Sequence, residues 1–97
     1  MILEIGLIQV ESSNHSNFEI AIRRAVDEVL VGAAGFLDFK LYKGIEEENT
    51  YLVHIIWESV EDHMVTFRQS ERFVKWREII SPYFLTAPKV NHWSGLC

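Results

Sequence analysis

The histidine at position 63 is the side chain of this sequence best suited to acid–base chemistry. It shares helical spacing with Val60, Met64 and Phe67, so it falls on the apolar face of a predicted helix and points inward. Because an imidazole titrates near neutral pH, an inward histidine could remove a proton from a bound substrate. The alternative is a structural core histidine that hydrogen-bonds a backbone carbonyl, and the sequence is equally compatible with both interpretations.

Aromatic and basic side chains could complete a binding pocket beside this histidine. The aromatics could wall in a planar ligand, although aromatics at helical spacing are more often simply core. Arg68 and Arg77 lie beside the apolar face, where they could hold an anionic or carbonyl group or pair with exposed glutamates. Tyr83 follows Pro82 and could roof the pocket or cover a helix end. The predicted substrate-binding residues are Trp57, Phe67, Arg68, Phe73, Trp76, Tyr83 and His92.

The other three histidines receive different assignments. His92 lies on the last predicted strand and is kept among the pocket residues. His54 faces away from Trp57 by strand alternation, so we place it on a sheet face available for a subunit contact. His15 lies in a polar loop, where solvation is expected, and receives no role.

Strands and helices alternate in the segments that must position these residues. The aliphatic run from Ile2 to Val10 predicts a strand that is apolar on both faces. Ser16 and Glu19 have the spacing of a capping box, which predicts that a helix starts there. Gly32 and Gly35 are predicted to end this helix, because glycine adopts the left-handed conformation without steric cost.

The second half repeats this alternation. Segments 36–43 and 50–57 predict a hairpin with an acidic loop, and the second strand is apolar enough to be central. Ser59 is expected to cap a second helix that restarts near residues 70–72 and stops before Pro82. A last strand is predicted at 89–94.

This order predicts one ferredoxin-like α+β domain over residues 1–97. Its βαββαβ chain would form a four-stranded antiparallel sheet with two helices on one face. The other face would be partly apolar, and a second copy packed sheet on sheet would cover it, which gives a homodimer in the form of a dimeric α+β barrel.

Composition excludes several function classes. The chain has 14 acidic and 9 basic residues and a formal charge of −5, without the basic cluster of a nucleic-acid-binding protein. No apolar run is long enough to span a membrane, and the N-terminus does not read as a signal peptide. The single cysteine, Cys97, cannot form an internal disulfide, so we expect a cytoplasmic protein.

Taken together, these motifs resemble the antibiotic biosynthesis monooxygenase family of dimeric α+β barrel proteins. The resemblance rests on motifs in the same order along nearly the whole chain. They are Gly35-Phe36, Tyr51, Trp57-Glu58-Ser59, Glu61-Asp62-His63, Phe67-Arg68, Ser70, Phe73, Trp76-Arg77 and Val90-Asn91-His92-Trp93.

The resemblance implies a monooxygenase that needs no cofactor and no metal. A pocket between sheet and helices would bind a small aromatic, hydroquinone or polyketide-like substrate, and O₂ would react with that substrate after a base removes its phenolic proton. On this basis His63 is the predicted catalytic residue. The sequence also lacks HExxH, CxxC and glycine-rich phosphate-loop motifs.

Two alternatives stay open. The chain could be a non-catalytic dimer that binds a small molecule or heme, or a structural or regulatory dimer without a pocket. Heme-degrading members of the family use a tryptophan and a histidine that fall near Thr66 and Trp76 here, and the first strand has no asparagine, so their ligand pattern is not matched. His63 could still ligate iron.

Overall fold

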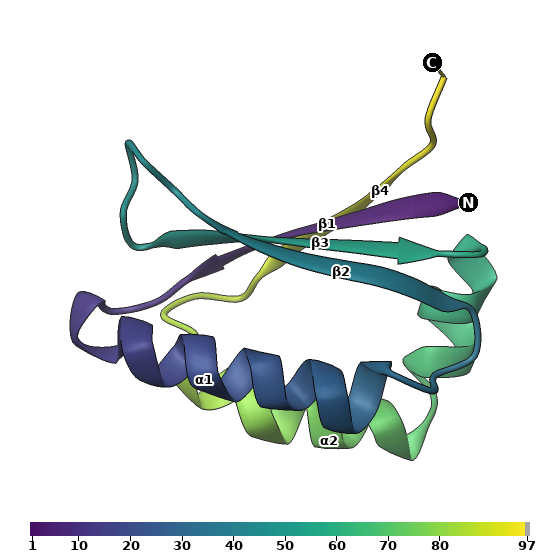
Figure 1. Ribbon diagram of the computed structural model, residues 1–97, viewed down its shortest axis with the longest axis horizontal. Helices are drawn as coiled ribbons and strands as arrows, with labels where there is room; N and C mark the ends of the chain where they lie inside the picture. Colours follow the sequence, from purple (N-terminus) through teal and green to yellow (C-terminus); the bar gives the residue numbers. More distant parts are fainter. Residues whose placement is uncertain (97) are drawn as a thin grey trace.

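Strands and helices follow one another in the order β1, α1, β2, β3, α2 and β4 (Figure 1), as the sequence predicts. The computed structural model describes residues 1–96. Cys97, on which the predicted cytoplasmic location was based, lies outside the described residues. No helix in residues 1–96 is long and apolar enough to cross a membrane. The elements are β1 Ile2–Gln9, α1 His15–Ala25, β2 Phe36–Lys43, β3 Thr50–Trp57, α2 Glu71–Ile80 and β4 Lys89–Trp93.

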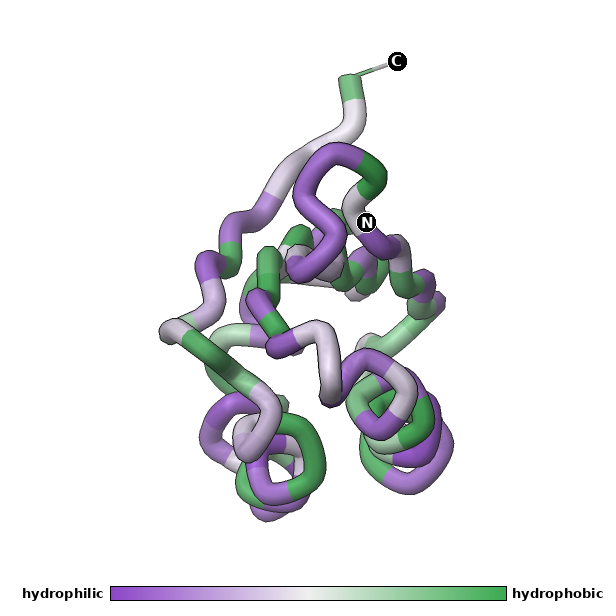
Figure 2. Tube along the Cα trace, turned by 90° about the vertical axis from the view of Figure 1, so that its left-hand side faces the viewer, coloured by the Kyte–Doolittle hydropathy of each residue, from purple (hydrophilic) through white to green (hydrophobic). Residues whose placement is uncertain are grey.

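The four strands form one antiparallel sheet in the order β2-β3-β1-β4. Strand β1 lies at the centre, where Gly6 is opposite Val53 of β3 on one side and Val90 of β4 on the other. Both helices lie on the same face of this sheet (Figure 1), and the view turned by 90° shows them side by side below it (Figure 2). The predicted ferredoxin-like α+β architecture is confirmed.

Strand alternation decides which side chains reach the helical layer. On β3, Tyr51, Val53, Ile55 and Trp57 are buried against the helices, and each exposes 3% or less of its surface. The paired positions on β1 carry Glu4, Gly6 and Ile8 on the same face, so a carboxylate stands opposite Ile55 within an apolar layer. Glu4 is therefore an acidic side chain buried on the otherwise apolar inner face of the sheet.

The opposite sheet face carries large apolar side chains that remain exposed in residues 1–96. Leu7 is 41% exposed, Tyr42 50% and Trp93 57%. His54 lies between them, opposite Ile5 and beside the ring of Tyr42, on the face that alternation predicted for it.

The start of α1 differs from the prediction. A 3-10 turn at Ser12–Asn14 precedes the helix, which begins at His15, so Ser16 lies inside the helix and caps nothing. Glu19 accepts a hydrogen bond of 2.5 Å from the hydroxyl of Tyr51 instead of reaching back to the backbone. The predicted capping box is therefore wrong, because a buried tyrosine on β3 competes for the same carboxylate.

Other predicted ends are confirmed. Gly32 and Gly35 follow the first helix with φ values of 92° and 78°, which are costly for residues with a Cβ. The hydroxyl of Ser59 accepts a 3.1 Å hydrogen bond from the backbone N–H of Asp62, as expected of a cap. A turn then separates this first part of the second helix from α2, which starts at Glu71.

Each helix contains a widened π-helical turn next to its regular part. These are η2 (Val26–Leu30), which continues α1, and η3 (Asp62–Phe67), which precedes α2. In η3 the N–H of Arg68 bonds the carbonyl of His63, five residues earlier, at 3.1 Å. His63 and Phe67 are the buried residues of this turn, so η3 aims an imidazole and a phenyl ring at the sheet.

Candidate active site

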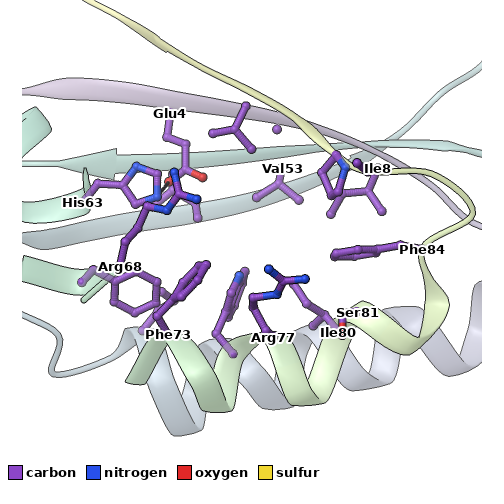
Figure 3. A pocket seen from close by; sticks show the side chains of 18 of the residues that line it. Glu4, Ile8, Val53, His63, Arg68, Phe73, Arg77, Ile80, Ser81 and Phe84 are labelled. Carbon is purple, nitrogen blue, oxygen red and sulfur yellow. Dashed lines mark ion pairs between the residues drawn. The ribbon is translucent and has the colours of Figure 1, made fainter. Parts of the chain in front are cut away.

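A cavity of about 810 Å³ lies between the sheet and the second helical segment. Strands β1 and β3 line one side, η3 and α2 line the other, and the segment from Ser81 to Pro88 closes one end (Figure 3). Most of its wall is aromatic or aliphatic. The exceptions include the ionisable side chains Glu4, His63, Arg68 and Arg77.

The side chain of Glu4 is the buried acid of this cavity, and the residue itself is only 7% exposed. Its Oε1 accepts a 2.8 Å hydrogen bond from the indole Nε1 of Trp57. The same oxygen lies 3.3 Å from Nε2 of His63. Burial raises the pKa of Glu4 to about 7, although the Trp57 hydrogen bond and the charge of Arg68 both lower it. Glu4 can therefore gain or lose a proton near neutral pH.

His63 connects Glu4 to a second histidine. Its Nδ1 lies 2.7 Å from Nε2 of His92 on β4, and its ring stacks on Trp57 with centroids 5.2 Å apart. Burial, His92 and Arg68 lower the pKa of His63 to about 4. Burial also lowers the pKa of His92. Both rings are therefore neutral at neutral pH, and Glu4 is the one of these three side chains that titrates there.

The three side chains have two consistent arrangements of hydrogens. When Glu4 is protonated, its O–H donates to Nε2 of His63, and Nδ1–H of His63 donates to Nε2 of His92. When Glu4 is ionised, Nε2–H of His63 donates to the carboxylate, and Nδ1 accepts from His92. The ionisation of Glu4 is thus linked to the tautomers of both histidines.

The predicted aromatic residues divide between the wall and its support. Trp57, Phe67, Phe73 and Trp76 all line the cavity, and the ring of Phe67 lies 5.3 Å from Trp57 and 5.8 Å from Phe73. Two predicted residues, Tyr83 and His92, are not among the lining residues. His92 instead contacts His63, which does line the cavity. The ring of Tyr83 packs against Phe18 of α1 at 6.0 Å, and the next residue, Phe84, lines the cavity in its place.

Arg68 lines the cavity beside the hydrogen-bonded side chains of Glu4, His63 and His92. Its guanidinium lies 5.4 Å from the centroid of Phe73, and its charge lowers the pKa of Glu4, His63 and His92. Figure 3 shows it extending from the helical side toward Glu4 and His63. Among residues 1–96, no group of three or more His, Cys, Asp or Glu side chains is arranged to hold a metal ion.

With this geometry in place, comparison with known proteins identifies the family. The sequence model described as antibiotic biosynthesis monooxygenase matches residues 1–79, which hold β1 to β3, η3 and most of α2. The chain belongs to the antibiotic biosynthesis monooxygenase family. The resemblance drawn from its motifs is confirmed.

Relatives of this monooxygenase family member span the chain almost completely. The structure of a Bordetella bronchiseptica protein named "Putative antibiotic biosynthesis monooxygenase" superposes with a TM-score of 0.93 at 32% identity, covering 99% of this chain and 97% of that one. The uncharacterized protein YczJ of Bacillus subtilis (strain 168) is 29% identical over 96 residues, which are 99% of this chain and 100% of YczJ.

A more distant structure shows the same fold. The Streptomyces coelicolor monooxygenase ActVA-Orf6, in complex with the ligand Nanaomycin D, has a TM-score of 0.84 at 18% identity and covers 99% of this chain and 88% of that one.

In this family member the sequence prediction missed Glu4, which accepts a hydrogen bond from Trp57 and lies beside His63. Strand alternation groups Glu4 with Gly6 and Ile8, but Leu3, Ile5 and Leu7 make the other face equally apolar, so the sequence did not decide which face points inward. The contact between His63 and His92 also had no local signal, because 29 positions separate the two residues. The structure brings these residues together by pairing β4 with β1.

Proposed function

We propose that this protein is a cofactor-independent monooxygenase that oxidises a small aromatic hydroquinone, hydroxyanthrone or polyketide-like phenol with O₂ in the cavity between sheet and helices. The observation that carries the proposal is a buried carboxylate with a pKa of about 7 at the wall of an aromatic cavity of about 810 Å³. Membership of the family supports it, as does the binding of Nanaomycin D by ActVA-Orf6, which shares the fold.

In this proposal Glu4 is the catalytic base and His63 acts through it. A base works best when its pKa lies near the working pH, and about 7 for Glu4 satisfies this condition whereas about 4 for His63 does not. His63 donates Nε2–H to the ionised carboxylate and orients it, and His92 fixes the tautomer of His63. The catalytic role expected for His63 therefore becomes a positioning role.

The reaction needs no external reductant, because the substrate supplies the electrons. Ionised Glu4 removes an acidic proton, and the substrate anion passes one electron to O₂. The radical pair forms a C–O bond, and the resulting peroxide takes the proton back from Glu4. Loss of the remaining C–H proton breaks the O–O bond and releases water, so a CH₂ group and O₂ become a carbonyl group and water.

The apolar wall serves this chemistry by keeping water from the anion and the radical pair. Trp57 and Phe67 are at most 4% exposed, and they hold Glu4 and His63 in fixed positions. Arg68 would stabilise the phenolate that forms when the proton leaves, since its charge already reaches Glu4.

Oxygen uptake with a hydroxyanthrone, corrected for its spontaneous oxidation, tests the proposal. We expect uptake in the native protein, a loss of about 100-fold or more in Glu4→Gln, and a smaller loss in His63→Ala. Glu11→Gln is the matched control, because Glu11 follows the same strand but is exposed. Uptake that is equal in Glu4→Gln and Glu11→Gln would refute the assignment of the base.

Ligand binding without turnover is the second function that the cavity supports. Binding of aromatic probes without oxygen uptake would favour it. A heme-binding version is less suited to this site, because both ring nitrogens of His63 already have partners in Glu4 and His92. The cavity also does not fit the alternative of a dimer with a filled, pocketless core.

We further propose that the protein works as a homodimer joined through the outer sheet face. Leu7, Tyr42 and Trp93 give that face exposed apolar surface, and Nδ1 of His54 is buried there without a hydrogen-bond partner in residues 1–96. Native mass spectrometry should show a dimer that Trp93→Asp converts to a monomer. A monomeric native protein would contradict this assembly.

A further inference from the structure

The cavity has a net positive charge, although the chain as a whole is negative. Its charge comes from three lining residues, Glu4, Arg68 and Arg77. The whole sequence has a net charge of −5, yet two of these three are arginines. The third, Glu4, is neutral for part of the time at pH 7 because its pKa is raised to about 7. The cavity is therefore cationic inside an acidic protein, which favours an anionic ligand.

The two arginines are free to bind such a ligand. Within residues 1–96 neither guanidinium forms an ion pair with a carboxylate, although exposed glutamates are frequent on the same helix. Arg68 contacts the ring of Phe73 and the sulfur of Met64. Both residues are exposed, so each guanidinium is reachable from solvent and can form a charge-assisted, bidentate pair with a carboxylate at the cavity.

The arginines occupy different parts of the cavity. Arg68 extends toward Glu4 and His63, whereas Arg77 rises from α2 nearer to Ser81 and Phe84 (Figure 3). Ser81 follows Arg77 by one helical turn and lines the same cavity, so its hydroxyl adds a donor beside the guanidinium. Thr86 lines the cavity from the closing segment. The end away from Glu4 thus holds a cation and two hydroxyl groups.

We propose that the substrate is an aromatic acid, whose phenol lies beside Glu4 and Arg68 and whose carboxylate is held by Arg77 at the other end of the cavity. This inference rests on the proposed function for the role of the phenol, and it adds the chemical class of the substrate. Arg77 is then the residue that decides specificity. Arg68 binds the phenol end, which an acid and its uncharged analogue share.

Calorimetric titration of the full chain under nitrogen tests this assignment without any turnover. The probes are 6-hydroxy-2-naphthoate and 6-hydroxy-2-naphthamide, which share the ring and the phenol and differ in the charge of the other end. The native protein should bind the acid about tenfold more tightly than the amide, the usual contribution of a charge-assisted hydrogen bond. Arg77→Gln should remove this preference, and Arg68→Gln should weaken both probes while it keeps the preference.

Arg23→Gln is the control, because Arg23 is exposed on α1 outside this cavity and should leave both affinities unchanged. Equal affinity of the native protein for acid and amide, failure to bind either probe, or an unchanged preference in Arg77→Gln would overturn the proposal. The anion site and the proposed oxygenase function can be refuted separately. Oxygen uptake with an uncharged hydroxyanthrone and no preference for the acid would refute only the anion site, whereas preference for the acid without any oxygen uptake would refute only the oxygenase.

Discussion

Replacement of Glu4 by glutamine should stabilise the protein at neutral pH while it removes activity. The carboxyl group has a pKa of about 7 in the folded protein and 4.5 as its ordinary value. This difference corresponds to about 3 kcal/mol, at 1.36 kcal/mol for each pH unit. Glutamine keeps the size of the side chain and an oxygen that can accept from Trp57, and it carries no charge to bury.

The sign of the effect follows from the order in which the two states lose the proton. Below pH 4.5 Glu4 is protonated in both states and costs nothing. Between pH 4.5 and 7 the unfolded chain ionises while the folded protein holds its proton, so the free energy of unfolding of the native protein falls. The advantage of Glu4→Gln should therefore grow from near zero at pH 4.5 to about 3 kcal/mol above pH 7.

His63 makes the comparison of two proteins necessary. Its pKa is lowered from 6.5 to about 4, so its contribution to stability is lost as the pH falls through this window, which opposes the trend from Glu4. The native protein alone can therefore show a nearly flat profile. Because His63 is present in both proteins, its contribution largely cancels in the difference.

Urea unfolding followed by tryptophan fluorescence from pH 4.5 to 8, at one fixed protein concentration, measures this difference. Glu11→Gln serves as the control and should differ from the native protein by a small amount that does not depend on pH. A stability difference for Glu4→Gln that is constant across the range would show that Glu4 titrates normally. Glu4 would then be ionised well below pH 7 and would not be a base tuned to neutral pH.

Substitutions at three further positions test other parts of the structure. Trp57→Phe removes the N–H that lowers the pKa of Glu4, so the pH of half-maximal oxygen uptake should move upward, and an unchanged pH profile would contradict the coupling. Gly6 lines the cavity, and a Cβ at this position would lie 3.7 Å from Val90 and 3.8 Å from Val53, which is ordinary contact. Gly6→Ala should therefore fold normally. Gly6→Leu should fill part of the cavity and weaken the binding of a naphthoate probe, measured by calorimetry, at least about tenfold. Gly35→Ala should cost about 2 kcal/mol or more in urea unfolding, because φ is 78° and the new Cβ would overlap the side chain of Asp62. Gly95→Ala, with nothing within 4 Å of its Cβ, should cost little, and equal stabilities of the two variants would contradict this.

Most of the fold could be predicted because local signals agreed with one another. The bounds predicted for β2 and β3 match the structure, since Gly35 before them and the acidic loop between them mark the ends of apolar runs. The start of α1 could not be read in the same way. Ser16 and Glu19 have the spacing of a cap, but only the packed structure shows that Tyr51, 32 positions away from Glu19, takes the carboxylate.

The site was predictable to a smaller degree. Helical spacing placed His63 and Phe67 inward, and both line the cavity. The charge state of His63 could not be predicted, because it depends on burial and on His92 from a different strand. Glu4 was overlooked for a related reason, since a single acid near a chain end gives no sign of the pKa that burial imposes on it.

The π-helical turn at Asp62–Phe67 has a consequence for how such sites diverge in evolution. A hydrogen bond that spans five positions encloses one more residue than the four-position bond of an α-helix. Deletion of a single codon among residues 64–66 would allow the segment to close as an ordinary α-helix, because the bond between Arg68 and His63 would then span four positions. Both bonds close one turn of helix, so the side chains on either side of the deletion would keep nearly the same faces. A relative that is one residue shorter at this turn should therefore still direct the counterparts of His63 and Phe67 toward the sheet.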